Sequence, residues 1–442
     1  MSVLRTMTWS AMDEAQRRVL CARGLEAIFD PDMKAAVGRI IDDVRTNGDE
    51  AVCRALSEFD GVVLEPHQLR ATTDEIAGAE VSPEVDRAID DAIVHLRAFN
   101  EQVMSRAGTW SFESEPGLTV GEKISPISSA GLFVPSGKAS YPSVAYQLGV
   151  PAVVAGVPEL ALVVPPMPDG SGLVDPAVLA VCHELGIDNV FRVNGPAGVA
   201  ALGFGTESIP QVRKIVGPGS PPVACAQVEM QRYGVATMMI LGPTESLVIA
   251  DDSADPRYVA ADLLNEAEHG TDSAVLLVTP SAKLCAEVDR ELQRQISDLP
   301  AARADSARAA LGVNGGCVFV DDLAAAADVA NRWAPEHLQV AVDASVEAEL
   351  VDRLVNAGEI LIGQNTLFAA GNYVIGCPAS LPTGGFAHVS TGITADAFLK
   401  HTAVARADAT ALTRMTPTIL AMSNHEGFVA HANAALIRRE VR

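Results

Sequence analysis

The stretch SLVIADDSADPRYVAADLLNEAEHGTDSAVLLVTP (residues 246–280) decides the fold class. It opens with a run of apolar residues, passes through Asp255-Pro256 into apolar positions at helical spacing, and reaches Gly270 before a second valine-rich run. Asp followed by Pro is typical of a helix N-terminus, and glycine is typical of a helix C-terminus. The stretch therefore predicts a strand, a helix and a second strand, which is the repeating unit of α/β proteins.

The same order of elements recurs along the chain. Further strands are predicted at residues 159–166, 189–193, 212–219, 316–320, 338–342 and 359–363, with helices or glycine-rich turns between them. The segment LALVVPP resembles VLLVTP, and VFRVNGPAGVAALGFGTESI resembles VFVDDLAAAADVANRWAPEHL. This similarity indicates duplication of one α/β unit, although two units that obey the same physics would show it as well.

We expect an α/β fold with two Rossmann-like domains and helical extensions at both ends. Helical spacing dominates up to about residue 110, and after about residue 365 the chain is glycine-rich and irregular before it ends in helices. The predicted divisions are an N-terminal helical segment (1–115), a first Rossmann-like domain (116–240), a second Rossmann-like domain (241–365) and an irregular and helical tail (366–442). Such a tail often packs on another domain or subunit.

The composition argues against several classes of protein. The chain has 442 residues and a net charge of -24, which repels nucleic-acid phosphates and anionic lipid. The seven cysteines lie far apart and form no CxxC pair, so neither a thiolate zinc site nor a disulfide framework is expected. The start lacks the apolar core of a signal peptide, and the most apolar region (141–166) is interrupted by prolines, glycines and Glu159. We expect a cytoplasmic protein that binds neither nucleic acid nor membranes.

Two pairs of polar residues have a spacing suited to chemistry. Glu266 and His269 lie three residues apart on the predicted helix, where a carboxylate and an imidazole on one face can hold a metal ion. A histidine in the last turn of a helix is also favoured by the helix dipole alone. Glu336 and His337 follow a proline at the start of a predicted strand. They could divide base and acid work, or they could be a solvated glutamate and a strand-edge histidine.

The glycine-rich turns do not decide whether the chain binds a dinucleotide cofactor. NGPAG (residues 194–198) and GPGS (residues 217–220) each follow a predicted strand. Neither matches the GxGxxG fingerprint of dinucleotide-binding proteins. Both turns suit a phosphate, and both also suit an ordinary connection between a strand and a helix.

A set of motifs occurs in a specific order along the chain. The motifs are GLFVPSGKASYPS, AGVPE, FGTESIPQVRKIVGPG, GPTESLVIAD, DLLNEAEHG, APEHL, LPTGG and EGFVAH. In this order they resemble the histidinol dehydrogenase family, and the resemblance extends from about residue 30 to the end. It implies a homodimeric enzyme that depends on zinc and NAD and oxidises a primary alcohol, through an aldehyde, to a carboxylate. It also implies that the C-terminal tail reaches into the partner's active site.

The resemblance assigns a catalytic pair and a set of metal ligands. By matching motif, Glu336 would activate water and His337 would take the alcohol proton. The implied ligands of one zinc ion per subunit are Glu266, His269, Asn372 and His431. The family has glutamine at the first of these positions and aspartate at the third, so the amide and the carboxylate have exchanged places. The set keeps one negative charge and two imidazoles, which favours Glu266 and His269 as ligands.

The implied substrate and cofactor positions are partly altered. Ser143 and Glu426 are retained, and Thr244 keeps the hydroxyl of the family's serine. Ala379 stands where the family has a histidine that contacts the substrate. At three positions that contact NAD, the family's tyrosine, glutamine and asparagine are replaced by Phe133, Ala197 and Ser220. NAD is therefore implied by the resemblance and not by these residues.

Two substrates and two other functions stay open. The substrate is histidinol or another small alcohol such as a sulfopropanediol, because LPTGG is closer to relatives that act on alcohols without an imidazole. A different reading is a catalytically inactive family member that serves as a binding protein. A further reading is a metal hydrolase that uses Glu336 without NAD.

Overall fold

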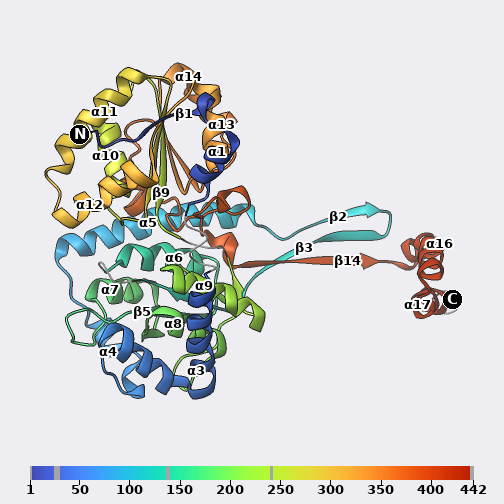
Figure 1. Cartoon of the computed structure of the whole chain (residues 1–442). Helices are drawn as coiled ribbons and strands as arrows, with labels where there is room; N and C mark the ends of the chain where they lie inside the picture. Colours follow the sequence, from blue (N-terminus) through green and yellow to red (C-terminus); the bar gives the residue numbers. More distant parts are fainter. Residues whose placement is uncertain (1, 24–29, 136–139, 239–241, 439–442) are drawn as a thin grey trace.

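The computed structural model describes residues 2–23, 30–135, 140–238 and 242–438. Figure 1 shows two α/β lobes, one above the other, and a long arm that leaves them sideways and ends in two helices. The predicted α/β class is confirmed, because each lobe contains a parallel sheet with helices on both faces.

The lower lobe is built on a five-stranded parallel sheet in the order β6-β5-β4-β7-β8. The strands are β4 (Ser129–Phe133), β5 (Glu159–Val164), β6 (Val190–Arg192), β7 (Lys214–Val216) and β8 (Ala236–Thr237). One face is covered by α5 (Pro83–Arg106), α6 (Pro142–Val154) and α7 (Pro176–Leu185), and the other by α3 (Pro31–Ala55), α8 (Gly195–Phe204) and α9 (Pro221–Met230). Consecutive residues Leu132 and Phe133 enter opposite cores, as expected of a strand buried on both faces.

The upper lobe is built on a six-stranded parallel sheet in the order β1-β11-β10-β9-β12-β13. The strands are β1 (Thr6–Thr8), β9 (Glu245–Ala250), β10 (Ala274–Thr279), β11 (Gly316–Phe319), β12 (His337–Ala341) and β13 (Glu359–Ile362). Its faces are covered by α10 (Pro256–Ala267), α11 (Ala282–Ile296) and α12 (Ala301–Ala309) on one side and by α1 (Glu14–Cys21), α13 (Leu323–Trp333) and α14 (Ala344–Arg353) on the other.

Both sheets place their strands in the same order. In the lower sheet β4 is central, with β5 and β6 on one side and β7 and β8 on the other. In the upper sheet β9 is central, with β10 and β11 on one side and β12 and β13 on the other, and β1 is added at the edge beyond β11. This shared topology agrees with the similarity seen in the sequence, and the duplication itself stays a hypothesis.

The N-terminal segment corrects one expectation. Most of the described part of residues 1–115 is helical, but Thr6–Thr8 form β1 and pair with β11 at the edge of the upper sheet. The helical prediction was wrong there, because a three-residue edge strand is too short to show a period of two. The boundary placed after residue 115 falls in the turn between the first two strands of the arm, and the boundary placed after residue 240 lies outside the described residues.

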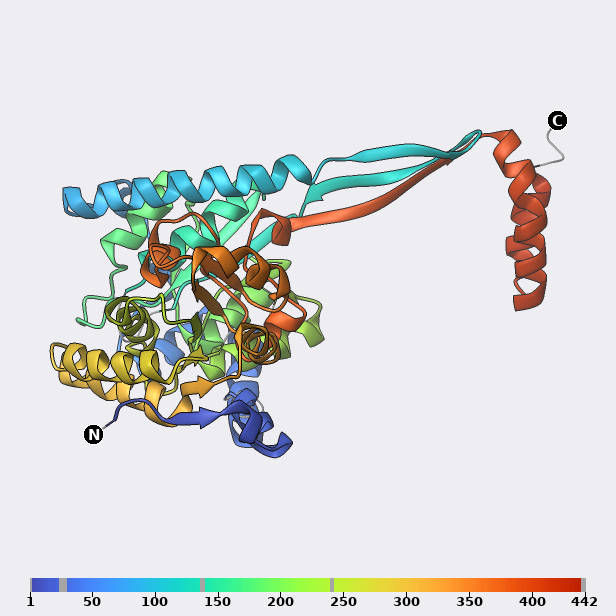
Figure 2. The same ribbon diagram turned by 90° about the horizontal axis from the view of Figure 1, so that it is seen from above.

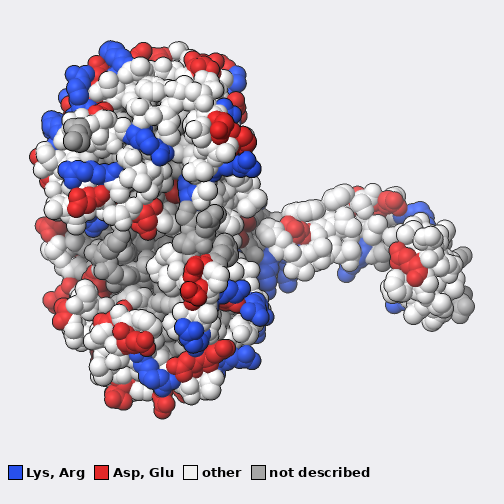
Figure 3. Space-filling view, viewed as in Figure 1, with Lys and Arg blue, Asp and Glu red and all other residues white. Residues whose placement is uncertain are grey.

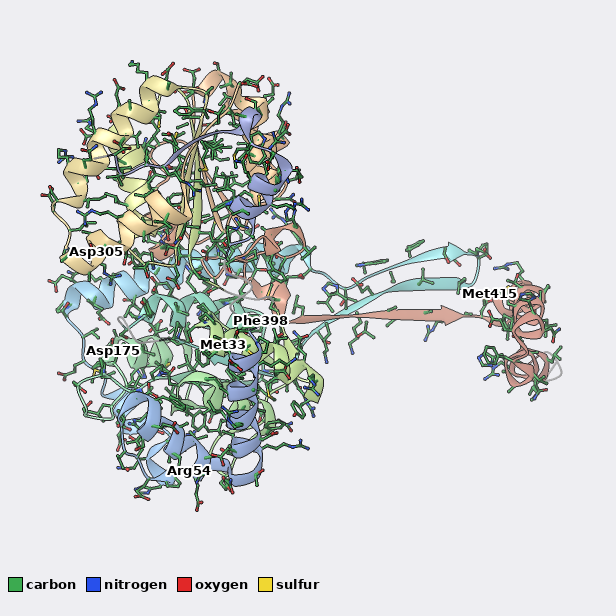
Figure 4. The ribbon with its side chains drawn as sticks, viewed as in Figure 1. Met33, Arg54, Asp175, Asp305, Phe398 and Met415 are labelled. Atoms are coloured by element: carbon green, nitrogen blue, oxygen red, sulfur yellow. The ribbon has the colours of Figure 1, made fainter. Side chains whose placement is uncertain are left out.

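The arm is an antiparallel sheet in the order β14-β3-β2. It consists of β2 (Trp110–Glu115), β3 (Leu118–Pro126) and β14 (Leu399–Ala407). It carries α16 (Ala409–Glu426) and α17 (Val429–Ile437) at its end, clear of both lobes (Figure 2). Phe398, fully buried, lies at its root, and Met415 lies at its far end (Figure 4). The irregular and helical tail expected from the sequence therefore also contains a strand.

None of the described helices combines the length and the apolar character that a bilayer-spanning segment requires. On the face shown in Figure 3, acidic and basic side chains are interspersed over both lobes, and no broad basic patch is visible.

Candidate active site

A cavity of about 460 Å³ lies between the two sheets. Pro135 follows β4 and Pro218 follows β7, so the lower sheet contributes the carboxyl ends of two neighbouring strands. Thr244 and Glu336 precede β9 and β12, so the upper sheet contributes amino ends. The chain reverses its winding between β4 and β7, and ligands of open α/β sheets bind outside the carboxyl ends at such a point.

A glycine permits the close approach of β4 and β7 at the cavity. Gly217 has φ = 133°, and a Cβ atom there would lie 2.1 Å from the carbonyl oxygen of Phe133. No larger side chain fits without moving the backbone. The glycine of the GPGS turn is therefore explained by strand packing, whatever the turn binds.

The predicted catalytic pair, Glu336 and His337, follows a backbone turn of unusual conformation. Ala334 ends α13 with φ = 50°, the only non-glycine residue of the described chain at positive φ. Such a conformation is uncommon for alanine, and strained residues often occur at functional sites. The turn leads to Glu336 and then His337, the first residue of β12, both of which line the cavity, and the two residues are 8% and 3% exposed.

Each member of the pair is fixed by one hydrogen bond. Glu336 Oε2 accepts a hydrogen bond from the backbone N–H of Glu245 at 3.0 Å. His337 Nδ1 lies 2.5 Å from Oε1 of Glu359, the first residue of β13. His337 Nε2 lies 3.8 Å from Glu336 Oε1, which is too far for a hydrogen bond. The Nε2 side of the imidazole is therefore open toward a ligand.

Burial and neighbouring charges perturb the pKa of both groups. Burial raises the pKa of Glu336 to about 8, although His337 works against it. Burial alone would lower the pKa of His337, but the carboxylates of Glu266, Glu336 and Glu359 outweigh it and raise that pKa to about 10. Groups perturbed in this way, and placed in a cavity, are candidates for acid and base chemistry.

Three of the four predicted metal ligands converge beside the pair. Glu266 is 1% exposed, and its Oε1 accepts hydrogen bonds from the amides of Asn265 at 2.6 Å and Asn372 at 2.8 Å. His269 Nε2 lies 3.4 Å from Glu266 Oε2. The helix ends at Ala267, two residues before the predicted end, and His269 still reaches the same face. A carboxylate, an imidazole and an amide therefore meet in one wall of the cavity.

The fourth predicted ligand lies elsewhere in the chain. His431 is in α17 and Glu426 ends α16, so both are exposed and at the far end of the arm. No group of three or more His, Cys, Asp and Glu side chains suited to a metal occurs among the described residues. Two features of the predicted set account for this, because its third member is an asparagine and its fourth is remote from the others.

The predicted substrate and cofactor positions divide in a similar way. Ser143, Thr244 and Ala379 line the cavity. Phe133 ends β4, Ala197 lies in the first turn of α8, and Ser220 caps α9, so all three are at the carboxyl edge of the lower sheet. Phe133 and Ala197 are buried, and neither side chain has a polar atom to offer a cofactor.

Sequence reasoning missed three residues of this site. Gln147 is 3% exposed, lines the cavity, and accepts a hydrogen bond from the backbone N–H of Ala379 at 3.0 Å. Glu245 and Glu359 are buried and charged, and each is the first residue of an otherwise largely apolar strand. That contrast was visible in the sequence and is the signal that could have found them.

A buried ion pair, Arg23–Glu245, lies next to the cavity in the upper lobe. Arg23 Nε lies 3.3 Å from Glu245 Oε1, the guanidinium lies over the ring of Trp333 at 4.0 Å, and both charged side chains are almost fully buried. Glu245 Oε1 also accepts the backbone N–H of Gly384 at 2.8 Å. Burial raises the pKa of Glu245 to about 7, against the opposing effect of Arg23. The ion pair Arg23–Glu245 thus connects the N-terminal segment to Glu336 and to the LPTGG loop.

Comparisons with known proteins agree with the motifs. The sequence profile described as histidinol dehydrogenase matches residues 26–439. Histidinol dehydrogenase of Xanthomonas euvesicatoria pv. vesicatoria (strain 85-10) is 38% identical over 445 residues, covering 99% of this chain and 100% of that protein. That of Rhizobium meliloti (strain 1021) is 39% identical over 410 residues, covering 92% of each. The crystal structure of histidinol dehydrogenase from Elizabethkingia anophelis matches with a TM-score of 0.92 and 30% identity, covering 100% of this chain and 99% of that one.

We predict that Arg23→Met destabilises the chain in a pH-dependent way. Removing one partner of a buried ion pair typically costs about 3–5 kcal/mol. The raised pKa of Glu245 means that the folded state holds this proton more tightly than the unfolded state, so stability falls as pH rises from the ordinary value of 4.5 toward 7. Urea unfolding should therefore show a larger loss at about pH 8 than at about pH 5. Arg18→Met, at an exposed position of α1, serves as the control and should change stability by less than about 0.5 kcal/mol. An equal loss at both pH values would contradict the interpretation.

Proposed function

The chain belongs to the histidinol dehydrogenase family, and on that premise we propose that it is a zinc-dependent, NAD-linked dehydrogenase of a primary alcohol. The alcohol would be oxidised through an aldehyde to a carboxylate. The observation that carries the proposal is the meeting, in one cavity, of the pair Glu336 and His337 with Glu266, His269 and Asn372. These residues come from β12, α10 and α15 (Phe368–Tyr373) and are far apart in the sequence.

The donor groups suit a divalent cation. A carboxylate oxygen, an imidazole nitrogen and an amide oxygen are accepted zinc ligands, and a second imidazole would complete a four-coordinate set. Glu266 is a buried carboxylate whose described contacts are two amides and a histidine, with no lysine or arginine among them. A buried charge of this kind favours a nearby cation.

The pair can divide the proton transfers of the reaction. When bound, zinc polarises the substrate oxygen as a Lewis acid and NAD accepts the hydride. His337 Nε2 takes the proton of the alcohol, and Glu336 takes a proton from the water that adds to the aldehyde carbon. Glu266 is one of the carboxylates that raise the pKa of His337. Once its charge is neutralised, that pKa falls toward the range of a general base.

The topology supports the proposed cofactor more than the side chains do. The carboxyl edge of the lower sheet at β4 and β7 is where a dinucleotide binds in folds of this class, and Pro218 and Gly219 already line the cavity there. Phe133, Ala197 and Ser220 supply fewer polar contacts than the family's residues. We therefore propose NAD with contacts made chiefly by the backbone.

The cavity lining narrows the choice of alcohol. Ala379 lines the cavity where the family has a histidine, which favours a small alcohol without an imidazole as the second candidate beside histidinol. The described lining contains neither lysine nor arginine, so it offers a sulfonate no cationic partner. The intact, buried pair gives no support to the inactive binding protein. Nothing in the described lining supports a hydrolase that works without NAD.

The proposed activity predicts a defined yield of NADH. Purified protein supplied with zinc and NAD should reduce about two NAD per alcohol consumed, with histidinol or with another small amino alcohol. His337→Asn should reduce turnover by about a hundredfold or more and leave the zinc content unchanged, because His337 moves a proton and is not a proposed ligand. Absence of NAD reduction across histidinol, amino alcohols and sulfonated diols would refute the proposal.

The exchanged ligands predict a compensating pair of substitutions. Glu266→Gln alone removes the single negative charge of the proposed set and should weaken zinc binding about 10- to 100-fold. Adding Asn372→Asp returns a carboxylate to the set and should recover most of the loss. Zinc affinity is measured by competition with a chelator, and Glu268→Gln, next to the site at the helix end, is the matched control. Equal affinities of the single and double variants would contradict the exchange.

The form of the arm supports the proposal that two copies of the chain associate. A three-stranded sheet without a covering layer is marginal in water, and the two outer strands of this one, β2 and β14, are exposed almost throughout. Trp110 and Phe112 stack on its surface at 6.3 Å and are 52% and 55% exposed. Because His431 and Glu426 lie beyond the arm, we propose that each chain delivers them to the cavity of a partner in a homodimer.

A shared site predicts complementation between two inactive variants. His337→Asn damages the cavity of its own chain, whereas His431→Ala damages the cavity of the partner. When the two variants are unfolded, mixed in equal amounts and refolded together, half of the dimers should contain one chain of each variant. Each such hybrid has one intact site of two, so about a quarter of the wild-type activity should return. Neither variant alone should recover. A mixture as inactive as its components would show that the site does not draw on two chains.

A further inference from the structure

We propose that Glu359 is a positioning residue that orients His337 and fixes the proton on its Nδ1. The kinetic part of this inference rests on the proposed function, in which His337 is the base. The structural part rests on the contact between the two side chains and is independent of the reaction. The residue lies in AGEILIG, a stretch in which the sequence indicated only a strand.

The sheet brings the two residues together. His337 and Glu359 are the first residues of β12 and β13, and the parallel register of these strands pairs them directly. Register partners in neighbouring strands point to the same face, so the side chains must meet. The backbone continues the pairing before the strands begin, because the N–H of Glu359 donates to the carbonyl of Glu336 at 3.1 Å. The geometry of this contact is therefore set by the sheet and not by a loop.

The contact is short and dry. Glu359 Oε1 lies 2.5 Å from His337 Nδ1, and the two residues are 8% and 3% exposed. A carboxylate accepts hydrogen bonds and cannot donate them, so Nδ1 must carry the proton. In a neutral imidazole this leaves Nε2 as the acceptor. Nε2 is the nitrogen that no described group engages within hydrogen-bond distance, so the contact prepares it to receive a proton.

Neighbouring residues hold both partners in place. The ring of Phe368 meets the imidazole edge to face at 5.8 Å, which restricts rotation of His337. Gly371 stands over Glu359, and a Cβ atom there would come within 3.0 Å of Oε1. A larger side chain at this position would press on the carboxylate. Glu359 Oε2 is buried and has no hydrogen-bond partner among the described residues, so His337 is the principal reason for a carboxylate at this position.

The arrangement has a general chemical logic. A carboxylate bonded to the far nitrogen of a histidine base selects one tautomer and stabilises the imidazolium that forms when the base takes a proton. Other carboxylates, from Glu245, Glu266 and Glu336, also act on His337 through space. Of these carboxylates, only Glu359 makes a hydrogen bond to the ring in the described structure. Orientation is therefore the property that its removal should change.

The test compares Glu359→Leu with Glu359→Asp. Leucine fills a similar volume and cannot accept a hydrogen bond, so kcat should fall about 100- to 10,000-fold with the alcohol that the wild type oxidises fastest. KM should change by less than about threefold, because the residue does not touch substrate. Aspartate keeps the carboxylate on a shorter stem and should recover at least about a tenth of the wild-type kcat. A Leu variant with kcat within about threefold of wild type would overturn the assignment.

A spectroscopic measurement decides the same point without turnover. In protein labelled with ¹⁵N-histidine, the resonance missing from His337→Asn identifies His337 among the nine histidines. Its Nδ1 proton should appear far downfield in the wild type and in Glu359→Asp, and should be lost in Glu359→Leu. An Nδ1 proton signal unchanged in Glu359→Leu would overturn the proposal. If the wild type oxidises no alcohol, the proposed function fails, whereas this measurement still tests the role of Glu359.

Discussion

Four buried carboxylates around one cavity are the constraint on which the site depends. Glu245, Glu266, Glu336 and Glu359 are each no more than 8% exposed. Each has a different principal partner: an arginine, two amides, a backbone N–H and a histidine, respectively. A buried carboxylate without such a partner would be strongly unfavourable. The fold therefore has to bring an N-terminal arginine, a C-terminal asparagine and two strand ends to the same place.

These partners leave an excess of negative charge. Arg23 and a protonated His337 can balance two of the four carboxylates, and burial raises the pKa values of Glu245 and Glu336 to about 7 and about 8. Two physical responses are available to such a site: uptake of protons or capture of a cation. A divalent cation at Glu266 would relieve the excess and leave Glu336 free to ionise. The electrostatics of the chain's own residues thus support the proposed zinc independently of the family.

The sequence predicted the parts of this structure that follow from local patterns. Most strands and helices of the two lobes, with their Asp-Pro starts, follow from spacing and capping, and spacing also singled out Glu266–His269 and Glu336–His337 as candidates. The apolar region 141–166 was wrongly read as buried strands and turns alone, because α6 is apolar on all sides and shows no helical period. Contacts between side chains of neighbouring strands could not be predicted from these local patterns. Glu359 meets His337 because β13 lies beside β12, and a single sequence does not give strand order. The arm was missed for a related reason: β2 and β14 are exposed along almost their whole length and β3 is mostly half-buried, so none of them shows the buried alternation that marks a strand.

The same excess of charge bears on the substrate. Electrostatic potential in a cavity with low-dielectric walls is focused, so a net negative lining favours ligands that carry a positive charge. An amino alcohol protonated at its nitrogen meets this condition, and a sulfonated diol does not. The replacement of a family histidine by Ala379 changes shape and hydrogen bonding but leaves this field intact, because Glu336 and Glu266 remain in the lining. In the proposed enzyme this field would favour a positively charged alcohol before a cation binds at Glu266, and once the cation is bound the choice of alcohol would depend on Glu336 and on the space left by Ala379.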